Sequence, residues 1–229
     1  MPPSDKVHIA ALQDSDIPTA FSMMSQSFGH DAPFINAYFI SHDTPAGQAQ
    51  GAKRLLAWKQ SAPESTFLKA VLTQDGEEII IGLAIWTHMV EAPPQTLEAT
   101  EGADEVKEYW PDEQDREWMK ILWSEYVKPR TEAVKSAGEK GVYVLELLAV
   151  HPSYQRLGAG AALVKWGVAA ADEKGLGAVI ESTDAGRLLY EKCGLKCEIE
   201  QMEFNVGEGF KGKKTPKLSF MVREAQRAN

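Results

Sequence analysis

The sequence predicts a protein of the α+β class, on three patterns. An apolar, β-branched run from Val142 to Val150 is typical of a strand buried on both faces, and it leads through a glycine-bearing turn into a helical pattern. Asp75-Gly76 separates two strand-like runs and predicts a hairpin. Helical patterns recur before and after this hairpin, so helices and strands are mixed along one chain.

The N-terminal part predicts a strand followed by two helices. The strand is expected over Val7 to Leu12, and Asp14-Ser15-Asp16 offers caps for the first helix. That helix has apolar residues at spacings of three and four between Ile17 and Phe28. The second is expected from Ala49 to Gln60. The two hairpin strands follow, over Thr66 to Thr73 and Glu78 to Trp86.

The segment from Thr87 to Gly141 has a helical composition, with several aromatic residues, over Asp104 to Ser136. Pro111 and Pro129 are expected to limit the helices, which predicts two helices with a break. In one interpretation the segment is an aromatic and acidic wall of an amine pocket, and in the other its aromatics dock a helix onto the sheet while its carboxylates face water. The carboxylates concerned are Asp112, Glu113, Asp115 and Glu117.

The buried strand is followed by a turn suited to an anion. Glycines at 158 and 160 precede a helix expected from Ala161 to Lys174, whose first backbone N–H groups have no intrahelical partner. A Walker loop is excluded because no lysine follows Gly160, and the dinucleotide fingerprint fails because its third glycine would fall at Leu163.

Two motifs carry a resemblance to the GNAT superfamily of N-acetyltransferases. The first is Gln155-Arg156-Leu157-Gly158-Ala159-Gly160, which fits the acetyl-CoA signature at every fixed position, after the lead-in Leu148 to Tyr154. The second is Ile180 to Leu195, which is similar to the strand, helix and Leu-Tyr-Glu-Lys-x-Gly ending of the family, with Leu195 where phenylalanine is usual.

The resemblance implies a mixed, mostly antiparallel sheet of about seven strands flanked by helices. Strands 4 and 5 would run parallel and splay apart, and acetyl-CoA would enter between them. The last two strands are expected over Lys196 to Val206 and Lys217 to Val222. The whole chain, residues 1–229, is predicted to be one such domain with a helical insertion at about 87–141.

The resemblance also implies the residues that hold acetyl-CoA. They are Leu148, Ala149, Val150, Gln155, Arg156, Leu157, Gly158, Ala159, Gly160 and Ala161. The backbone N–H of Val150 is expected to bind the thioester oxygen, and Ser182 and Arg187 are expected near the pantetheine or adenosine end. Tyr190, in the Leu-Tyr-Glu-Lys motif, is expected to protonate the CoA thiol.

An amine is protonated at neutral pH and must lose a proton before it attacks a thioester. Glu146 is a candidate base because it is the one charge in an apolar strand, where burial would raise its pKa. Glu181, near the end of the partner strand, is the other. Each carboxylate could instead bind backbone, with an ordered water taking the proton. No histidine lies in a nucleophile motif, so direct transfer is expected.

Composition limits the partners and the compartment. The chain has 24 Lys and Arg against 33 Asp and Glu, a net charge of −9 that argues against nucleic acid. Cys193 and Cys197 are too few for a disulfide framework and lack the spacing of a metal site. No signal peptide or membrane span is evident, which predicts a cytoplasmic protein, with the nucleus as the other compartment.

The resemblance implies an enzyme that transfers acetyl from acetyl-CoA to an amine without a metal, and the long aromatic segment favours a small molecule as the acceptor. The sequence leaves open whether the protein forms a homodimer. The alternative is a protein of the same fold that binds acyl-CoA for sensing or structure without turnover.

Overall fold

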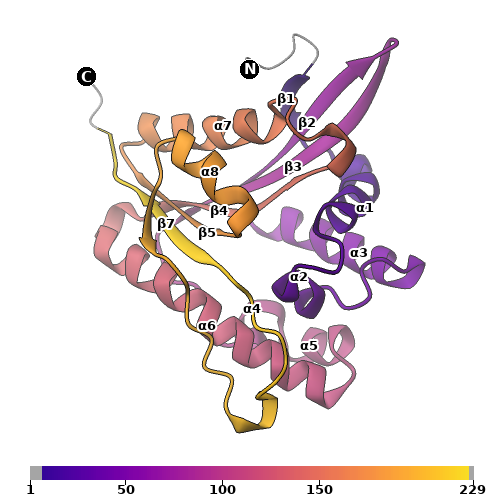
Figure 1. Ribbon diagram of the computed structural model, residues 1–229, viewed down its shortest axis with the longest axis vertical. Helices are drawn as coiled ribbons and strands as arrows, with labels where there is room; N and C mark the ends of the chain where they lie inside the picture. Colours follow the sequence, from indigo (N-terminus) through magenta and orange to yellow (C-terminus); the bar gives the residue numbers. More distant parts are fainter. Residues whose placement is uncertain (1–6, 227–229) are drawn as a thin grey trace.

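A computed structural model describes residues 7–226, and in that range the chain forms one seven-stranded sheet with helices on both faces (Figure 1). The strand order is β1-β2-β3-β4-β5-β7-β6, and every neighbouring pair is antiparallel except β4 and β5. The strands are β1 (Val7–Ala11), β2 (Ser65–Gln74), β3 (Glu77–Met89), β4 (Val142–Val150), β5 (Gly177–Ser182), β6 (Lys196–Ile199) and β7 (Ser219–Arg223). The predicted mixed sheet with a parallel central pair is confirmed.

Helices cover the two faces unequally. One face carries α7 and α8, and the other carries α1, α3 and α6, with α2, α4 and α5 beside them (Figure 1). The helices are α1 (Ile17–Phe28), α2 (Pro33–Tyr38), α3 (Pro45–Ser61), α4 (Leu97–Glu101), α5 (Ala103–Tyr109), α6 (Glu113–Ala137), α7 (Ala159–Glu173) and α8 (Asp184–Lys192). This arrangement buries β4 on both sides and explains its continuous apolar sequence.

Several boundaries differ from the sequence predictions for local reasons. The second helix begins at Pro45 because Thr44 caps it, accepting from the Gly47 N–H, and proline suits the first helical position. Helix α2 was not predicted. The strand expected over Lys196 to Val206 ends at Ile199, after which the chain leaves the sheet.

Proline 129 was expected to end a helix, and this expectation is wrong. Helix α6 runs through it to Ala137, whereas the predicted break does occur before Glu113, beside Pro111. An interior proline costs about 3 kcal/mol. The buried residues on both sides of it, Tyr126 and Val134 among them, hold α6 against the sheet and offset that cost.

The aromatic residues of the segment between β3 and β4 dock it onto the sheet. They are buried in one cluster with strand residues such as Val144 and Phe220. The four acidic residues lie elsewhere: Asp112 caps α6, Asp115 and Glu117 pair with lysines, and Glu113 is exposed. The docking interpretation therefore holds for these side chains.

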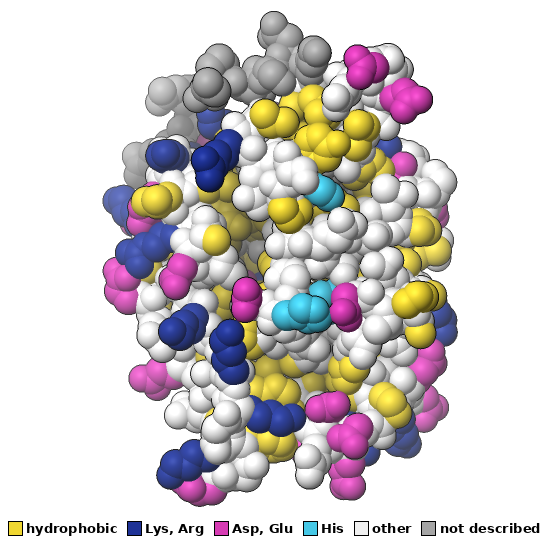
Figure 2. All heavy atoms as spheres, turned by 45° about the vertical axis from the view of Figure 1, so that its right-hand side comes forward, with side chains coloured by type: hydrophobic (Ala, Val, Ile, Leu, Met, Phe, Trp, Pro, Cys, Tyr) yellow, Lys and Arg dark blue, Asp and Glu magenta, His cyan; other side chains and the backbone are white. Residues whose placement is uncertain are grey.

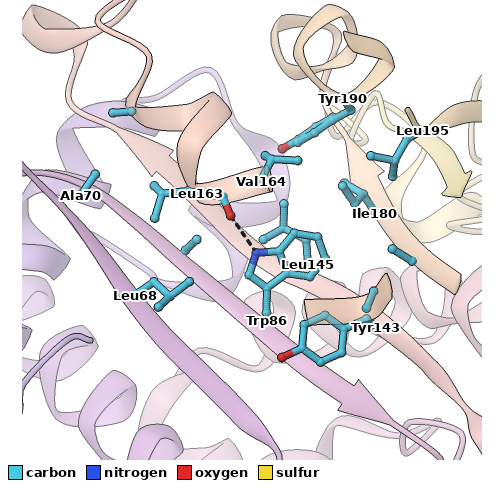
Figure 3. Packing of buried hydrophobic residues seen from close by; sticks show 14 of the residues in the cluster. Leu68, Ala70, Trp86, Tyr143, Leu145, Leu163, Val164, Ile180, Tyr190 and Leu195 are labelled. Atoms are coloured by element: carbon cyan, nitrogen blue, oxygen red, sulfur yellow. Dashed lines mark hydrogen bonds between the residues drawn. The ribbon is translucent and has the colours of Figure 1, made fainter. Parts of the chain in front are cut away.

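The core between the sheet and α7 depends on close packing around Trp86. Its ring is fully buried, stacks on Tyr143 and donates from Nε1 to the Leu163 carbonyl at 3.2 Å (Figure 3). Gly167 of α7 lies against this ring, and a Cβ there would come within 2.0 Å of it. The helix can approach the sheet this closely only because residue 167 has no side chain.

We predict that Gly167→Ala destabilises the protein although alanine is the better helix former. The gain in helix propensity is about 1 kcal/mol, whereas overpacking against the immobile Trp86 ring costs about 1–3 kcal/mol and should exceed it. Urea denaturation measures the change. Gly209→Ala is the control, since a Cβ there meets nothing within 4 Å, and equal stability of Gly167→Ala and wild type would contradict the packing described.

Candidate active site

The site begins where two parallel strands stop pairing. β4 and β5 are joined from Val142 and Gly177 as far as Leu145 and Ile180, and beyond that pair β4 continues to Val150 without a β5 partner. β5 stays paired with β7 on its other side to Ser182. A cavity of about 380 Å³ opens at this point, lined by the ends of both strands and by α2, α6 and α8.

A β-bulge in β4 sets the direction of the side chains at this gap. The register against β3 shifts so that Trp86 faces Leu145 and Ile85 faces Leu147, which leaves Glu146 as an extra residue. Glu146 and Leu147 consequently lie on the face of α6 and α1, and Leu148 returns to the face of α7 with Leu145. The bulge thereby places a carboxylate beside the gap.

The backbone of Val150 also faces the gap. The next residue, His151, donates its N–H to the Ile81 carbonyl of β3 at 2.9 Å. In an antiparallel pair, consecutive residues direct their backbone N–H and C=O groups to opposite sides of the strand. The backbone groups of Val150 therefore point away from β3, to the side on which β5 lies. Its carbonyl accepts from the Ser27 hydroxyl of α1 at 3.0 Å instead of from a strand. The Val150 N–H thus points to the side on which β4 has no strand partner, and it has no acceptor within residues 7–226.

The turn before α7 presents several backbone donors. Gly158 adopts the left-handed conformation (φ +91°), as does Arg156 (φ +65°), and the first helical residue is Ala159. Over the described chain, the N–H groups of residues 156–161 have no backbone or side-chain acceptor, the first bond being from Ala162 to Gly158. The turn therefore presents the free donors that an anionic group such as a phosphate binds.

Tyr190 lines the same cavity from α8, on the α7 side of the sheet. Figure 3 shows its ring beside Val164 and Ile180. The side chain is buried, and burial raises the pKa of its phenol well above the usual value. The hydroxyl therefore keeps its proton at neutral pH and has that proton available to donate.

On the other face, Glu146 and Glu181 meet a buried arginine from α6. The Arg130 guanidinium binds both oxygens of Glu181, with Nε to Oε1 at 3.0 Å and Nη2 to Oε2 at 2.5 Å, and its Nη1 donates to Glu146. The Tyr126 hydroxyl donates to Glu181 at 3.2 Å. Burial raises the pKa of Glu146, against the opposing effect of Arg130.

The structure brings most of the predicted site residues together, but Ala149 is buried in the core beneath α1 and two others do not face the cavity. Leu148, Tyr190 and both glutamates line the cavity, and the turn from Gln155 to Ala161 is close by because Gly160 packs beside Val150.

Two predicted site residues, Ser182 and Arg187, point away from the cavity. Ser182 is buried and donates to the Thr183 carbonyl, and Arg187 pairs with Glu191 and Glu200.

Sequence reasoning missed Arg130, Ser27 and the role of Tyr126. The spacing of Tyr126 and Arg130 places them one turn apart on the same helix face, but this pattern alone does not reveal a partner on β4 or β5. Their contacts with Glu181 span 51 residues or more along the chain.

Lys and Arg are interspersed with Asp and Glu on the face in Figure 2, so no continuous field of one sign forms there. In residues 7–226 no helix is long and apolar enough to cross a membrane, and no group of three or more His, Cys, Asp or Glu is arranged to hold a metal ion.

This fold combines a parallel pair of strands that splay apart with an open helix N-terminus beside them. Residues 35–195 match the model of the acetyltransferase (GNAT) family, and the chain belongs to that family. The family uses acetyl-CoA. A search of curated proteins found no match in sequence.

Solved structures share the fold at low sequence identity. An arylalkylamine N-acetyltransferase 2 from Aedes aegypti is 13% identical with a TM-score of 0.62, over 96% of this chain and 99% of that one. A histone acetyltransferase HPA2 and related acetyltransferase from Corynebacterium glutamicum is 17% identical with a TM-score of 0.59, over 98% and 99%. A mosquito arylalkylamine N-acetyltransferase like 5b is 14% identical with a TM-score of 0.58, over 95% and 99%.

We predict that Arg130→Met lowers the free energy of unfolding by about 3 kcal/mol, because it leaves two buried carboxylates without a cation. Adding Glu181→Gln to that variant should recover part of the loss by removing one of those charges. Urea denaturation at neutral pH measures both changes. An Arg130→Met protein as stable as wild type would show that the carboxylates do not depend on the arginine.

Proposed function

We propose that the protein is an N-acetyltransferase that moves the acetyl group of acetyl-CoA directly to the amine of a small molecule. The observation that carries this proposal is the gap between β4 and β5, which has unbonded amides of the α7 turn on one face and two carboxylates on the other. A donor and an amine could meet there from opposite faces of the sheet.

Three elements of the chain would hold the donor, which when bound supplies an activated acetyl thioester. The free N–H groups of residues 156–161 and the positive end of α7 would bind the diphosphate. The end of β4 would pair with the pantetheine in place of β5. The Val150 N–H would donate to the thioester oxygen as negative charge develops on it.

Two side chains would handle the protons. Glu146, partly exposed to the cavity, would take a proton from the ammonium directly or through water. Tyr190, on the other face, would return a proton to the departing sulfur. Glu181 is held by Arg130 and Tyr126 and would contribute its charge to the attraction of a cationic amine.

The cavity favours a small acceptor with an apolar body. Its wall from α1 and α2 includes Phe28, Phe34 and Ile35, and Phe34 stacks on Tyr126 with ring centroids 4.3 Å apart. A volume of about 380 Å³ suits one small molecule. Two of the similar structures are named arylalkylamine N-acetyltransferases, which supports an amine of this kind.

We also propose that the chain is a single domain, since one continuous sheet joins its parts.

A CoA-release screen against polyamines, aminosugars, arylalkylamines, amino acids and lysine peptides tests this function. Release with one small-amine class supports the proposal and names the substrate. Tight CoA binding without release across the panel would support the alternative of an acyl-CoA-binding protein, and release only with peptides would contradict the small-molecule acceptor.

We predict that Gly160→Trp abolishes acetyl-CoA binding. A Cβ at residue 160 already approaches Leu189 to 3.2 Å and Val150 to 3.5 Å, so an indole must project into the space over the turn. Calorimetric titration with acetyl-CoA measures the affinity, and circular dichroism checks that α7 is retained. Unchanged affinity would refute the assignment of the diphosphate to this turn.

We predict that Tyr190→Phe lowers kcat by about ten-fold or more, the lower part of a general-acid contribution, while acetyl-CoA affinity is retained. The ring fills the same space in both proteins. Burial and, to a smaller extent, Cys193 raise the pKa of the phenol, so the wild-type hydroxyl holds its proton until it is donated. Steady-state kinetics and calorimetry give the two quantities. A kcat equal to that of wild type would exclude Tyr190 from the proton transfer.

A further inference from the structure

Arg130 bridges two strands at the place where their pairing has ended. It comes from α6 and is 2% exposed, yet its guanidinium contacts Glu146 of β4 and Glu181 of β5. The two glutamates lie one residue beyond the last paired residues, Leu145 and Ile180. No other cation is placed between these carboxylates in the described chain, so their geometry depends on this side chain.

The two carboxylates are held differently. Glu181 is 1% exposed, accepts from Arg130 through both oxygens and also accepts from Tyr126, so its lone pairs are largely used. Glu146 is 13% exposed and receives one donor from the guanidinium. Of the pair, Glu146 is the one that retains an oxygen for a proton from the cavity.

The charges around the pair leave one net negative charge. Two carboxylates and one guanidinium sum to −1, and the groups that influence Glu146 are Arg130, Glu181 and the Thr87 hydroxyl of β3. Tyr126 of α6 adds a neutral phenol, because burial raises its pKa. Four further charged side chains line the same cavity farther out, two of each sign: Asp31, Asp184, Lys214 and Lys217.

We propose that Arg130 is a positioning residue for the deprotonation of the amine: it occupies Glu181 with two donors and fixes Glu146 as the carboxylate that accepts the proton. This inference rests on the proposed function. The ammonium N–H bond breaks and its proton goes to Glu146. The freed nitrogen lone pair forms the C–N bond, the C–S bond breaks with its electron pair on sulfur, and sulfur takes the Tyr190 proton. The second proton that the nitrogen loses in becoming a neutral amide returns to the Tyr190 oxygen through water.

The charges around Glu146 predict how kcat/KM depends on pH. Glu146 must be ionised to act, so kcat/KM falls as the pH drops through its pKa. Removing the Arg130 charge leaves two adjacent buried carboxylates, which raises the pKa of Glu146 and moves this acidic limb to higher pH. Removing the Glu181 charge has the opposite effect and moves the limb to lower pH.

The test compares kcat/KM against pH, with the best amine of the screen, for wild type and five variants. The variants are Arg130→Met, Arg130→Lys, Glu181→Gln, the double variant Arg130→Met with Glu181→Gln, and Lys135→Met. The last is the control, since Lys135 is an exposed residue of α6 that pairs with Glu132 away from the cavity.

We expect Arg130→Met to shift the limb upward by about one pH unit or more and to lower kcat/KM at neutral pH by about ten-fold or more. Arg130→Lys should keep the limb near that of wild type but lower kcat, because the ammonium retains the charge and loses the two-pronged contact. The double variant should bring the limb back down, with the KM for acetyl-CoA unchanged throughout.

A limb that stays in place in Arg130→Met, with only kcat reduced, would overturn the proposal and leave Arg130 a structural residue. If Arg130→Met does not fold, the Glu181→Gln variant tests the proposal. An acidic limb of kcat/KM that stays at the wild-type pH, or moves to higher pH, in that variant would overturn the proposal. Carbon-13 NMR of labelled glutamate in the protein without substrates follows the Glu146 titration directly. That titration separates this inference from the proposed function, because it needs no turnover.

Discussion

The end of hydrogen bonding between β4 and β5 at Leu145 and Ile180 is the constraint on which the rest of the site depends. Each strand keeps its other neighbour, β3 for β4 and β7 for β5, so the two halves of the sheet remain rigid while the space between them opens. Arg130 then spans that space by binding a carboxylate from each strand. The gap has a fixed width because paired strands define one end of it and a buried ion cluster holds the next residues.

The free backbone of β4 gives this gap its two faces. Beyond Leu145, the backbone groups of β4 that do not bond to β3 point along the sheet into the space left by β5. There Ser27 donates to the Val150 carbonyl. The bulge at Glu146 turns a carboxylate to the α6 face, and the return of alternation leaves Leu148 facing α7. In the proposed function, one strand would bind acetyl-CoA through its backbone and the amine through a side chain.

The chain contains a second buried arginine that has a structural role. Arg54 donates to the Tyr38 carbonyl and to Glu101, and its guanidinium lies over the rings of four aromatic residues from α2, α5 and the loops that follow them. It joins α3 to the helices around α6 but lines no part of the cavity between β4 and β5. A buried ion pair is weak evidence for stability alone, so it is the placement of Arg130 at the cavity that distinguishes the two.

Local patterns predicted many of the helices and strands, the family resemblance implied the arrangement of the sheet, and long-range contacts account for what both missed. The strand from Val142 to Val150, the Gly158 turn and the hairpin at Asp75-Gly76 were predictable because each depends on neighbouring residues. The path of α6 through Pro129 was not, since tertiary burial overrides the proline, and the pairing of Arg130 with Glu146 and Glu181 depends on where α6 docks. Glu146 could be identified as an unusual charge in an apolar strand, but its cationic partner had no signal in the local sequence.

The most direct measurement is a crystal structure of the protein with CoA bound. The diphosphate should lie on the N–H groups of residues 156–161, the pantetheine should run along β4 beyond Leu145, and the sulfur should lie between Val150 and Tyr190. A CoA molecule bound elsewhere, or a gap closed by pairing of β4 with β5 beyond Ile180, would contradict the assignment of acetyl transfer to this site.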